Sequence, residues 1–416
     1  MWEQIRANQR RSVLLIISMA IALIALGAAA GGAIAWPAGV SFGIGVALVI
    51  WLIQMAIYFG GAESLLLHGA VAKELKREDS PQLFNIVEEI QLASGLSFVP
   101  RLHLIDDPAP NAFAVGSKPA NSAICVTTGL LHRLNRDELQ GVIAHEMSHL
   151  KNRDVQFMTL AAVMLGSIVI LSEIIVRTMR FGGRSRDRSE SRGGGGQIQL
   201  IIFVLALIFA ILGPIMAQLL YFACSRKREY LADACGATFT RYPEGLAAAL
   251  EKISQTNVPV SFAGKATAPL FIVNPLAVAS EGPALFATHP PTADRIRILR
   301  SMAGASLAAY ETAYQQANGG TLIGPESLRT DPATPIRPAA DDEPIATRQE
   351  VHTTALRAHG YVPVTCRCGT EIQVPADRST TVVNCIRCGT SLPIPQDLCR
   401  AGMPTELPVT LPRISW

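Results

Sequence analysis

The chain has 416 residues, of which 49% are hydrophobic and 17% are charged, and its formal net charge is +3. Soluble domains usually carry about 25% charged residues, so this composition excludes a highly charged soluble protein and a wholly disordered one. The near-balance of charge provides no overall basic field for binding nucleic acid. The length allows two or three folded units.

Four apolar runs lie before residue 224, and each is long enough for a helix to cross a bilayer. They are residues 13–36, 38–59, 155–176 and 200–223. One such run could be a buried core helix, but four runs of this length favour membrane helices. The first run resembles a signal peptide, but it is longer than the usual apolar core of one and a second run follows at once. We therefore predict an uncleaved membrane hairpin over residues 1–59 and a second hairpin over residues 155–223.

Lysine and arginine residues flank the runs on what would be one side of the membrane, and the positive-inside rule makes that side cytoplasmic. The loop 177–197 disagrees, because it carries six arginines and would lie outside. Either this loop is translocated despite its charge, or the last two runs form a hairpin that does not fully cross. The sequence leaves both open, and Gly193–Gly196 is typical of a flexible linker in either case.

Residues 60–154 predict a soluble α+β segment. A helical apolar pattern covers Ala62–Leu75, and a second helix begins after Ser80, with proline in its first turn, and ends at Gly95. Another helix begins near Asn135 with acidic residues in its first turn, and its pattern continues straight into the third apolar run. Between these helices lie short β-prone runs separated by turn residues, at 101–105, 112–115 and 123–127.

After the fourth run, the pattern is helical over Ser225–Gln255, irregular over 256–287 and helical again over Thr292–Met302. Residues 318–361 are rich in Pro, Asp, Thr and Ala without periodicity, which predicts a flexible linker. The predicted division of the chain is, in order, 1–59, 60–154, 155–223, 224–317, 318–361, 362–395 and 396–416. In this division 60–154 and 224–317 are two halves of one soluble domain, and 396–416 is a tail.

The strongest chemical signal is His145-Glu146-Met147-Ser148-His149, inside a predicted helix. Residues four apart lie on one helix face, about 6 Å apart along the axis, so both imidazoles can bind one Zn²⁺. Glu146 lies to the side, where its carboxylate can act as a general base beside the metal. The alternative is a surface helix with two incidental histidines.

A zinc peptidase needs a third protein ligand, and the best candidate is Glu229, in the helix that follows the fourth run. Asp233 lies one turn further along, where it could hydrogen-bond a metal-binding imidazole. The alternative is a solvated, charged helix start. The residues alone favour neither interpretation.

Taken together, four motifs resemble the HtpX-like membrane metalloproteases, a family related to the CAAX prenyl proteases. In chain order they are Pro110–Gly116, the His145–His149 motif with Asn152-Arg153-Asp154, the run Ser225–Asp233, and Thr288-His289-Pro290-Pro291. The resemblance covers about residues 1–302 and implies an α+β, gluzincin-type fold. It implies zinc ligands His145, His149 and Glu229 with Glu146 as catalytic base. It also implies endopeptidase activity on membrane or misfolded proteins in a bacterial-type inner membrane, from an active site that faces the cytoplasm.

The same resemblance implies supporting roles. Asp154, like Asp233, would orient a metal-binding imidazole. An edge strand would hold the substrate backbone by strand addition, with residues Asn111, Ala112, Phe113, Ala114 and Gly116. His289 would lie near the site and stabilise the oxyanion, although a histidine before two prolines is more often a loop residue. Arg295 is a further candidate polar partner, with a solvated helix face as the alternative.

Four of the eight cysteines form two knuckles outside the resemblance, Cys366-Arg367-Cys368-Gly369 and Cys385-Ile386-Arg387-Cys388-Gly389. Thiolates on tight glycine turns make a closed tetrahedral zinc site, so residues 362–395 resemble a small β zinc ribbon, although the first knuckle is one residue short. The alternative is a disulfide pair or a redox site, and a cytoplasmic location favours metal. Cys399 lies too far along the chain to be an obvious ligand. Small core or membrane-flank positions are predicted for Cys125, Cys224 and Cys235.

The leading hypothesis is a membrane-embedded zinc endopeptidase, acting in membrane protein quality control, with one catalytic and one structural Zn²⁺. Its partners would be protein or peptide substrates and the lipid bilayer, and no partner of the ribbon follows from the sequence. A catalytically silent membrane scaffold is the second hypothesis, but a scaffold would not need Glu146. A membrane-tethered nucleic-acid binder is the third. The tail lacks a basic patch interleaved with aromatic residues, so we expect no nucleic-acid partner.

Overall fold

The computed structural model describes residues 37–163, 226–256, 267–273, 289–329, 331–340, 348–375 and 382–394, with isolated positions between 10 and 28 and at 258, 260 and 261. Several sequence predictions fall outside these residues. They are most of the first apolar run, the third run beyond Val163, the loop 177–197, the fourth run, Cys224, Cys399 and the tail 396–416.

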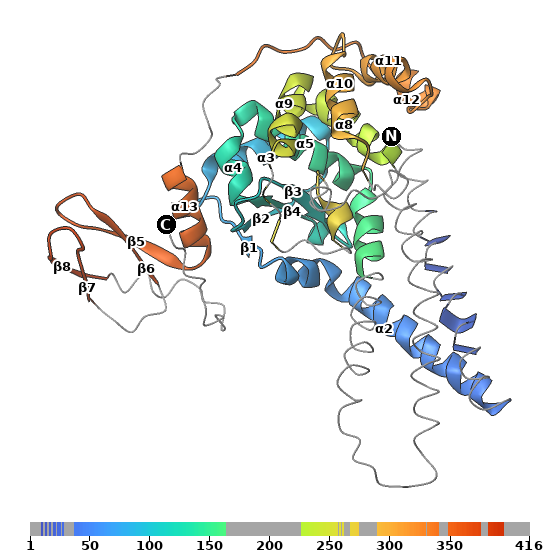
Figure 1. The fold of residues 1–416 in the computed structure, drawn as a ribbon, viewed down its shortest axis with the longest axis horizontal. Helices are drawn as coiled ribbons and strands as arrows, with labels where there is room; N and C mark the ends of the chain where they lie inside the picture. The colour runs from blue at the N-terminus through green and yellow to red at the C-terminus, as the bar shows by residue number, and fades with distance from the viewer. Residues whose placement is uncertain are drawn as a thin grey trace, which may run out of the picture.

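Helix α2 (Ala38–Gly69) projects from the folded domain and contains the second apolar run (Figure 1). Within the described part of the chain it is the one helix long and apolar enough to cross a membrane. Many of its large apolar side chains are exposed, among them Phe42 and Leu52. A kink at Gly61, where φ is 137°, separates this apolar part from the end that packs on the domain. Glycine adopts this backbone conformation readily because it has no Cβ.

A four-stranded sheet forms one layer of the domain. The three predicted strands are confirmed as β2 (Arg101–Ile105), β3 (Ala112–Val115) and β4 (Ala123–Thr127). The order is β1-β2-β4-β3, with β2 parallel and β3 antiparallel to β4, so β3 is an edge strand. β1 (Lys73–Glu74) replaces the end of the helix predicted over Ala62–Leu75, because α2 ends at Gly69 and Val71 adopts a φ of 53°.

Helices lie on one side of this sheet (Figure 1). They are α3 (Pro81–Ser94), α4 (Thr128–Arg133), α5 (Arg136–Lys151), α8 (Arg226–Thr240), α9 (Pro243–Ser254) and α10 (Thr292–Arg300). α5 packs directly on β3 and β4, whereas α8 and α9 pack on α5 and on each other, and α10 packs on α8 and α9. The helix predicted after Ser80 is confirmed as α3, which ends at Gly95 with a left-handed φ of 67°. α5 begins with a capping box in which the side chains of Asn135 and Glu138 each bond the other residue's backbone N–H.

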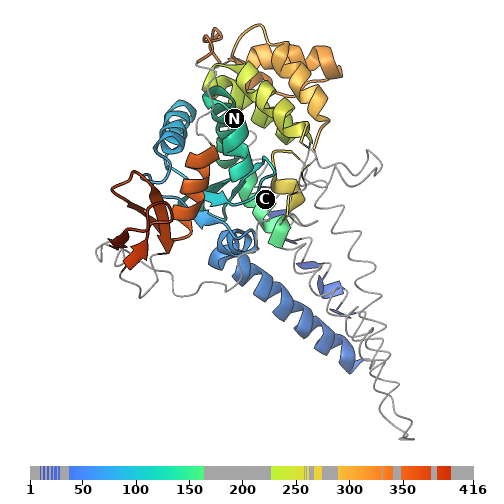
Figure 2. The same cartoon turned by 60° about the vertical axis from the view of Figure 1, so that its left-hand side comes forward.

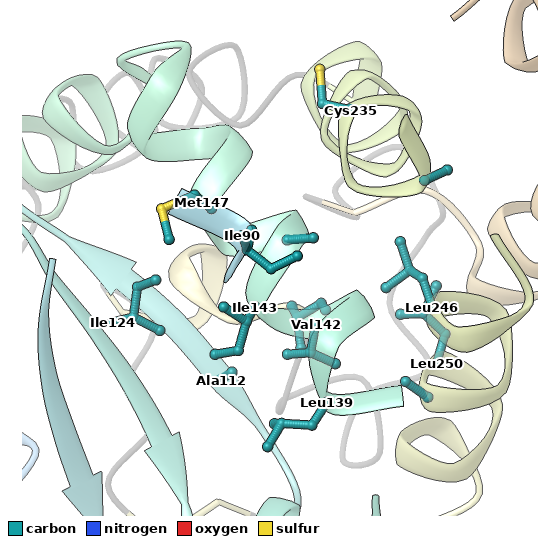
Figure 3. Close-up of a cluster of buried hydrophobic side chains, with 14 of the residues drawn as sticks. Ile90, Ala112, Ile124, Leu139, Val142, Ile143, Met147, Cys235, Leu246 and Leu250 are labelled. Carbon is teal, nitrogen blue, oxygen red and sulfur yellow. The ribbon is translucent and has the colours of Figure 1, made fainter. Parts of the chain in front are cut away.

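The core of the domain lies between α5, the sheet and two other helices. Figure 3 shows Val142, Ile143 and Met147 of α5 between Ile124 of the sheet and the side chains of α8 and α9. The helices approach closely at glycines. A Cβ at Gly236 of α8 would lie 3.2 Å from the backbone nitrogen of His145. α8 therefore packs directly on the part of α5 that carries the His-Glu-x-x-His motif.

The predicted continuation of α5 into the third apolar run is wrong. α5 ends at Lys151, and Arg153 adopts a left-handed φ of 59°. A residue in this conformation ends an α-helix, because its backbone cannot continue the i to i+4 hydrogen bonds. A separate helix covers Asp154–Val163, and its side chains are buried within the domain. The helix predicted over Ser225–Gln255 is likewise two helices, α8 and α9. The break lies at Arg241, with a φ of 55°, just before the proline that begins α9.

Residues 318–361 are more structured than a flexible linker. After α11 (Leu307–Asn318) they contain α12 (Pro325–Arg329) and α13 (Arg348–Ala358). The segment 331–340 follows the surface of the main domain, where Arg337 bonds Asp137 and Gln140 of α5. Val351 and Ala355 of α13 are buried in the main core. Composition could not show this, because these contacts are made to residues distant in sequence.

A small unit of two hairpins follows α13, and Figure 2 shows it at one side of the domain. β5 (Tyr361–Thr365) pairs with β6 (Glu371–Pro375), and β7 (Val382–Asn384) pairs with β8 (Ser391–Pro393). The unit has its own small core, formed by Val364, Cys366, Val374, Cys385, Leu392 and Ile394.

Candidate functional site

His145 and His149 of α5 converge with Glu229 of α8, and their ligand atoms all lie within 4.8 Å of one another. The two Nε2 atoms are 3.2 Å apart; Glu229 Oε2 lies 3.6 Å from that of His145, and Glu229 Oε1 lies 3.6 Å from that of His149. All three side chains are buried. Ligand atoms bound to one tetrahedral Zn²⁺ lie roughly 3.3 Å apart, so these separations fit a zinc site.

Two further carboxylates fix the orientation of the imidazoles. His145 Nδ1 lies 2.9 Å from Asp233 Oδ1, and His149 Nδ1 lies 3.1 Å from Asp154 Oδ2. With its hydrogen on Nδ1, each ring donates to its carboxylate and turns the lone pair of Nε2 toward Glu229. In this tautomer the two Nε2 lone pairs and the Glu229 carboxylate converge, and such a set of ligand atoms fits a cation.

The charges of the site are strongly coupled. Burial lowers the pKa of His145, but hydrogen bonds to Asp233 and Glu229 outweigh burial and raise that pKa to about 9. Burial also opposes the ionisation of Glu229, but the neighbouring His289 and His145 hold the pKa of this carboxyl below its ordinary value. The ionised Glu229 carboxylate suits a cation, and a metal ion that binds here would displace the proton that the raised pKa places on His145.

Glu146 is buried beside this cluster, and only 1% of its surface is exposed. Within the described part of the chain, neither of its carboxylate oxygens has a hydrogen-bond partner. Burial raises the pKa of Glu146. A buried carboxyl group without a partner costs stability and calls for an explanation. A general base has these properties, because it must accept a proton and keep a free oxygen for it.

Arg295 of α10 completes the polar cluster. Its Nε and Nη2 donate to the two oxygens of Asp233 at 2.8 and 2.7 Å, and its Nη1 lies 3.8 Å from Glu229 Oε2. The solvated-face alternative for this residue is wrong, because Arg295 is 1% exposed. The distance between α8 and α10 cannot be read from the sequence, so this pairing could not be predicted.

His289 also lies at the site, with Nε2 at 3.9 Å from Glu229 Oε2. Its ring forms a hydrogen bond with the backbone of Phe271, and burial lowers its pKa. The residue is 8% exposed, so it is not a solvent-facing loop residue.

The predicted substrate-binding residues lie along the edge strand. Ala112 and Ala114 of β3 face the main core, whereas Phe113 faces α2. Gly116 donates its N–H to Thr159 at 3.2 Å. Part of the outer edge of β3 contacts the segment Phe271–Val273 of the same chain. Sequence reasoning missed this segment, because residues 256–287 show no periodic pattern.

The four knuckle cysteines also come together, with all Sγ atoms within 4.8 Å of one another. The Cys366–Cys388 and Cys368–Cys385 sulfur distances are 3.5 and 3.6 Å. A disulfide needs about 2.05 Å, whereas sulfurs bound to one tetrahedral Zn²⁺ lie roughly 3.8 Å apart. The distances therefore fit a metal site.

Glycines make the knuckle turns possible. Gly369 and Gly389 have left-handed φ values of 83° and 74°. Each knuckle also closes a backbone hydrogen bond, from Cys366 to Thr370 and from Cys385 to Thr390. Outside the knuckles, Cys125 and Cys235 are buried in the core, as the sequence predicts.

Comparison with known proteins identifies a family that matches this chain. The model of peptidase family M48 matches residues 77–303, so the knuckle cysteines lie outside the match. The chain is 47% identical to a protease HtpX homolog of Dictyoglomus turgidum over 261 residues, which are 62% of this chain and 82% of the relative. It is 44% identical to one of Dictyoglomus thermophilum over 302 residues, 72% of this chain and 94% of the relative.

A protease HtpX homolog of Listeria monocytogenes is 39% identical over 306 residues, 73% of this chain and 100% of the relative. No solved structure matches the chain.

Proposed function

Because this chain belongs to peptidase family M48 and is a metalloprotease, we propose that it is a membrane-embedded zinc endopeptidase. In this proposal the zinc ligands are His145, His149 and Glu229, and Glu146 is the general base. The observation that carries it is a buried carboxylate that has no hydrogen-bond partner among the described residues and lies beside three converging ligand atoms.

Each residue then has a task. Bound zinc would supply a Lewis acid that polarises a peptide carbonyl and favours loss of a proton from water. Glu146 accepts the proton of the attacking water on a carboxylate oxygen and passes it to the leaving amine. His289 donates a hydrogen bond to the developing oxyanion. Asp233 and Asp154 hold the two imidazoles in the orientation that ligation needs.

The test compares two substitutions in the purified full-length protein. Glu146→Gln is expected to keep zinc and lose peptide cleavage, because the amide cannot accept the proton. His145→Ala is expected to lose both. Zinc content and cleavage of a fluorogenic peptide are the measurements, and cleavage by Glu146→Gln at the wild-type rate would refute the assignment of the base.

The substrates in this proposal are membrane or misfolded proteins, and the role is quality control at the membrane. The support is the placement of α2, which packs against the domain close to the edge strand: Ser117, two residues after β3, donates to Glu63 of α2 at 2.7 Å. The proposed active site thus lies on a domain attached directly to an apolar helix. Zinc-dependent cleavage of a membrane protein reconstituted in liposomes, with Glu146→Gln as control, tests the substrate class.

The proposed topology is multi-pass, with the soluble halves 60–154 and 224–317 and the C-terminus in the cytoplasm. Membrane-impermeant labelling of single cysteines placed in the loop 177–197 tests it in whole cells. Labelling from outside is expected if the last two runs span, and protection from labelling would place the loop inside.

We further propose that Cys366, Cys368, Cys385 and Cys388 bind a second, structural zinc ion. The support is the sulfur separations and the glycine turns on which the cysteines lie. Reconstitution with Co²⁺ tests it, because thiolate ligands give intense near-ultraviolet charge-transfer absorption that imidazole and carboxylate ligands do not. This absorption is expected in the wild-type protein and absent from Cys385→Ser, and its absence from both would refute the site.

A further inference from the structure

Four groups at the proposed active site bind the same short segment of the chain. Ala112 of β3 accepts a hydrogen bond from the backbone N–H of Ile272 at 3.0 Å. Arg295 Nη1 donates to the carbonyl oxygen of Ile272 at 2.8 Å, and Asn111 Nδ2 donates to that of Val273 at 3.0 Å. The ring of His289 bonds the backbone of Phe271.

All of these contacts are made to the backbone of Phe271–Val273. Phe271 also forms an antiparallel bridge with Phe113, so the segment lies on β3 as an added strand would. Any extended peptide could make the same bonds, because none depends on the side chains of the segment. The bonding groups are the edge strand, His289 and Arg295, and the first two are those assigned above to substrate.

The side chains of the segment alternate between two apolar environments, as in a strand. Phe271 packs edge-to-face on Phe113, with ring centroids 5.0 Å apart, on the side that faces α2. Ile272 is buried in the main core on the other side. A pocket of 170 Å³ lies against Phe271 and is lined further by α2 and η2 (Ala268–Leu270), through Leu65, Leu66, Gly69, Ala70, Thr267 and Leu270.

We propose that Phe271–Val273 occupies the place of an extended substrate, so that the protease in this conformation inhibits itself. A substrate must displace the segment, and the substrates that do so carry large apolar residues at the positions of Phe271 and Ile272. This inference rests on the proposed function, since it takes β3 as the substrate strand. Because the segment is part of the same chain, it competes with substrate for β3 at a high effective concentration, and peptides that bind β3 weakly cannot displace it.

The first experiment weakens the segment without touching the groups that bind it. Ile272→Ala removes a buried side chain and keeps the backbone N–H that Ala112 accepts. We expect kcat/KM for a fluorogenic peptide to rise on the order of tenfold in the full-length protein, because less packing must be given up when the segment leaves. The matched control is Ile253→Ala in α9, an isoleucine of the same core away from β3, which is expected to give no rise.

An unchanged or lower kcat/KM in Ile272→Ala, with zinc content and thermal unfolding close to those of the wild type, would overturn the proposal. That result differs from a failure of the proposed function, in which neither the wild-type protein nor any variant cleaves peptides.

The second experiment does not depend on catalysis. A fluorescent peptide with the sequence of residues 268–275 is titrated into zinc-loaded Glu146→Gln protein, and binding is followed by anisotropy. We expect saturable binding, about tenfold tighter when Ile272→Ala is added, and no binding of a scrambled peptide. Equal binding of both peptides, or no binding of either, contradicts the proposal. If Ile272→Ala does not fold, the comparison of the two peptides on the Glu146→Gln protein alone decides.

Discussion

The two clusters of metal-binding side chains differ in ligands, in burial and in what lies beside them. The first combines two imidazoles and one carboxylate, all buried, on helices α5 and α8. The second combines four cysteines on two glycine turns, and Cys368 and Cys388 are exposed. Only the first has a buried carboxylate without a hydrogen-bond partner next to it, among the residues that the structure describes.

The number of protein ligands at each site distinguishes a catalytic metal ion from a structural one. Three protein ligands leave one position of a tetrahedral ion open to water or substrate, and Glu146 is the neighbouring acceptor. Four thiolates leave no position open, so the ion can only tie two hairpins together. The unit around the cysteines has its own small core, separate from the core around α5. We therefore expect the first site to control activity and the second to control the folding of residues 361–394.

The largest expected effect comes from the carboxylate that supports His145. Asp233 is fully buried, and its negative charge compensates the positive charge of Arg295, which is 1% exposed. Asp233→Asn is expected to destabilise the domain by about 3–5 kcal/mol, because it leaves a buried charge unpaired. It should also weaken zinc binding by about 10- to 100-fold. Urea unfolding and a zinc competition titration measure the two effects.

The matched control is Glu244→Gln. This substitution removes the carboxylate of an exposed ion pair between Glu244 and Arg300. Solvent screens such a pair, so we expect little change in unfolding and none in zinc binding. Equal effects of the two substitutions would contradict the idea that the first metal site depends on a buried network.

A smaller effect is expected at the segment that joins the two regions. Arg337 binds Asp137 and Gln140 at the start of α5, and its guanidinium lies over the ring of Tyr242. Arg337→Ala should lower the free energy of unfolding of the domain by about 1–3 kcal/mol, since Asp137 is buried and loses a partner. Zinc in the cysteine site should stay in place. Loss of that zinc would show that the two regions are coupled, and the comparison above would then fail.

The smallest effect is expected within the cysteine site. The hydroxyl of Thr390 lies 3.1 Å from the sulfur of Cys388. Thr390→Val should reduce the zinc affinity of this site by about tenfold at most and leave peptide cleavage unchanged. A chelator competition assay measures the first and a peptide assay the second. A loss of cleavage in this variant would assign the cysteine site to catalysis.

The sequence predicted those parts that depend on local signals. The strands at 101–105, 112–115 and 123–127 are bounded by turn residues, and α3 is bounded by Ser80 and Gly95, so their limits could be read directly. The spacing of His145 and His149 placed two ligand atoms on one helix face. Glu229 and Asp233 could be proposed because they too lie one turn apart, although their distance to α5 could not be known.

The parts that were missed depend on tertiary contacts. No residue near Arg153 predicts its left-handed backbone conformation. This conformation ends α5 and directs the next helix toward the interior of the domain. Arg337 lies in a segment whose composition is typical of a linker, yet it binds residues about 200 positions earlier. Phe271–Val273 has no periodic pattern, and its position is fixed by bonds to β3, His289 and Arg295.

The most direct test of the division between the two sites is to measure zinc and peptide cleavage together in three full-length proteins. We expect about two zinc ions per chain in the wild type, and about one in both His145→Ala and the double variant Cys385→Ser/Cys388→Ser. Cleavage should be lost in His145→Ala and stay within about twofold of wild type in the cysteine variant. Cleavage that falls with the zinc of the cysteine site, or that persists in His145→Ala, would contradict the account.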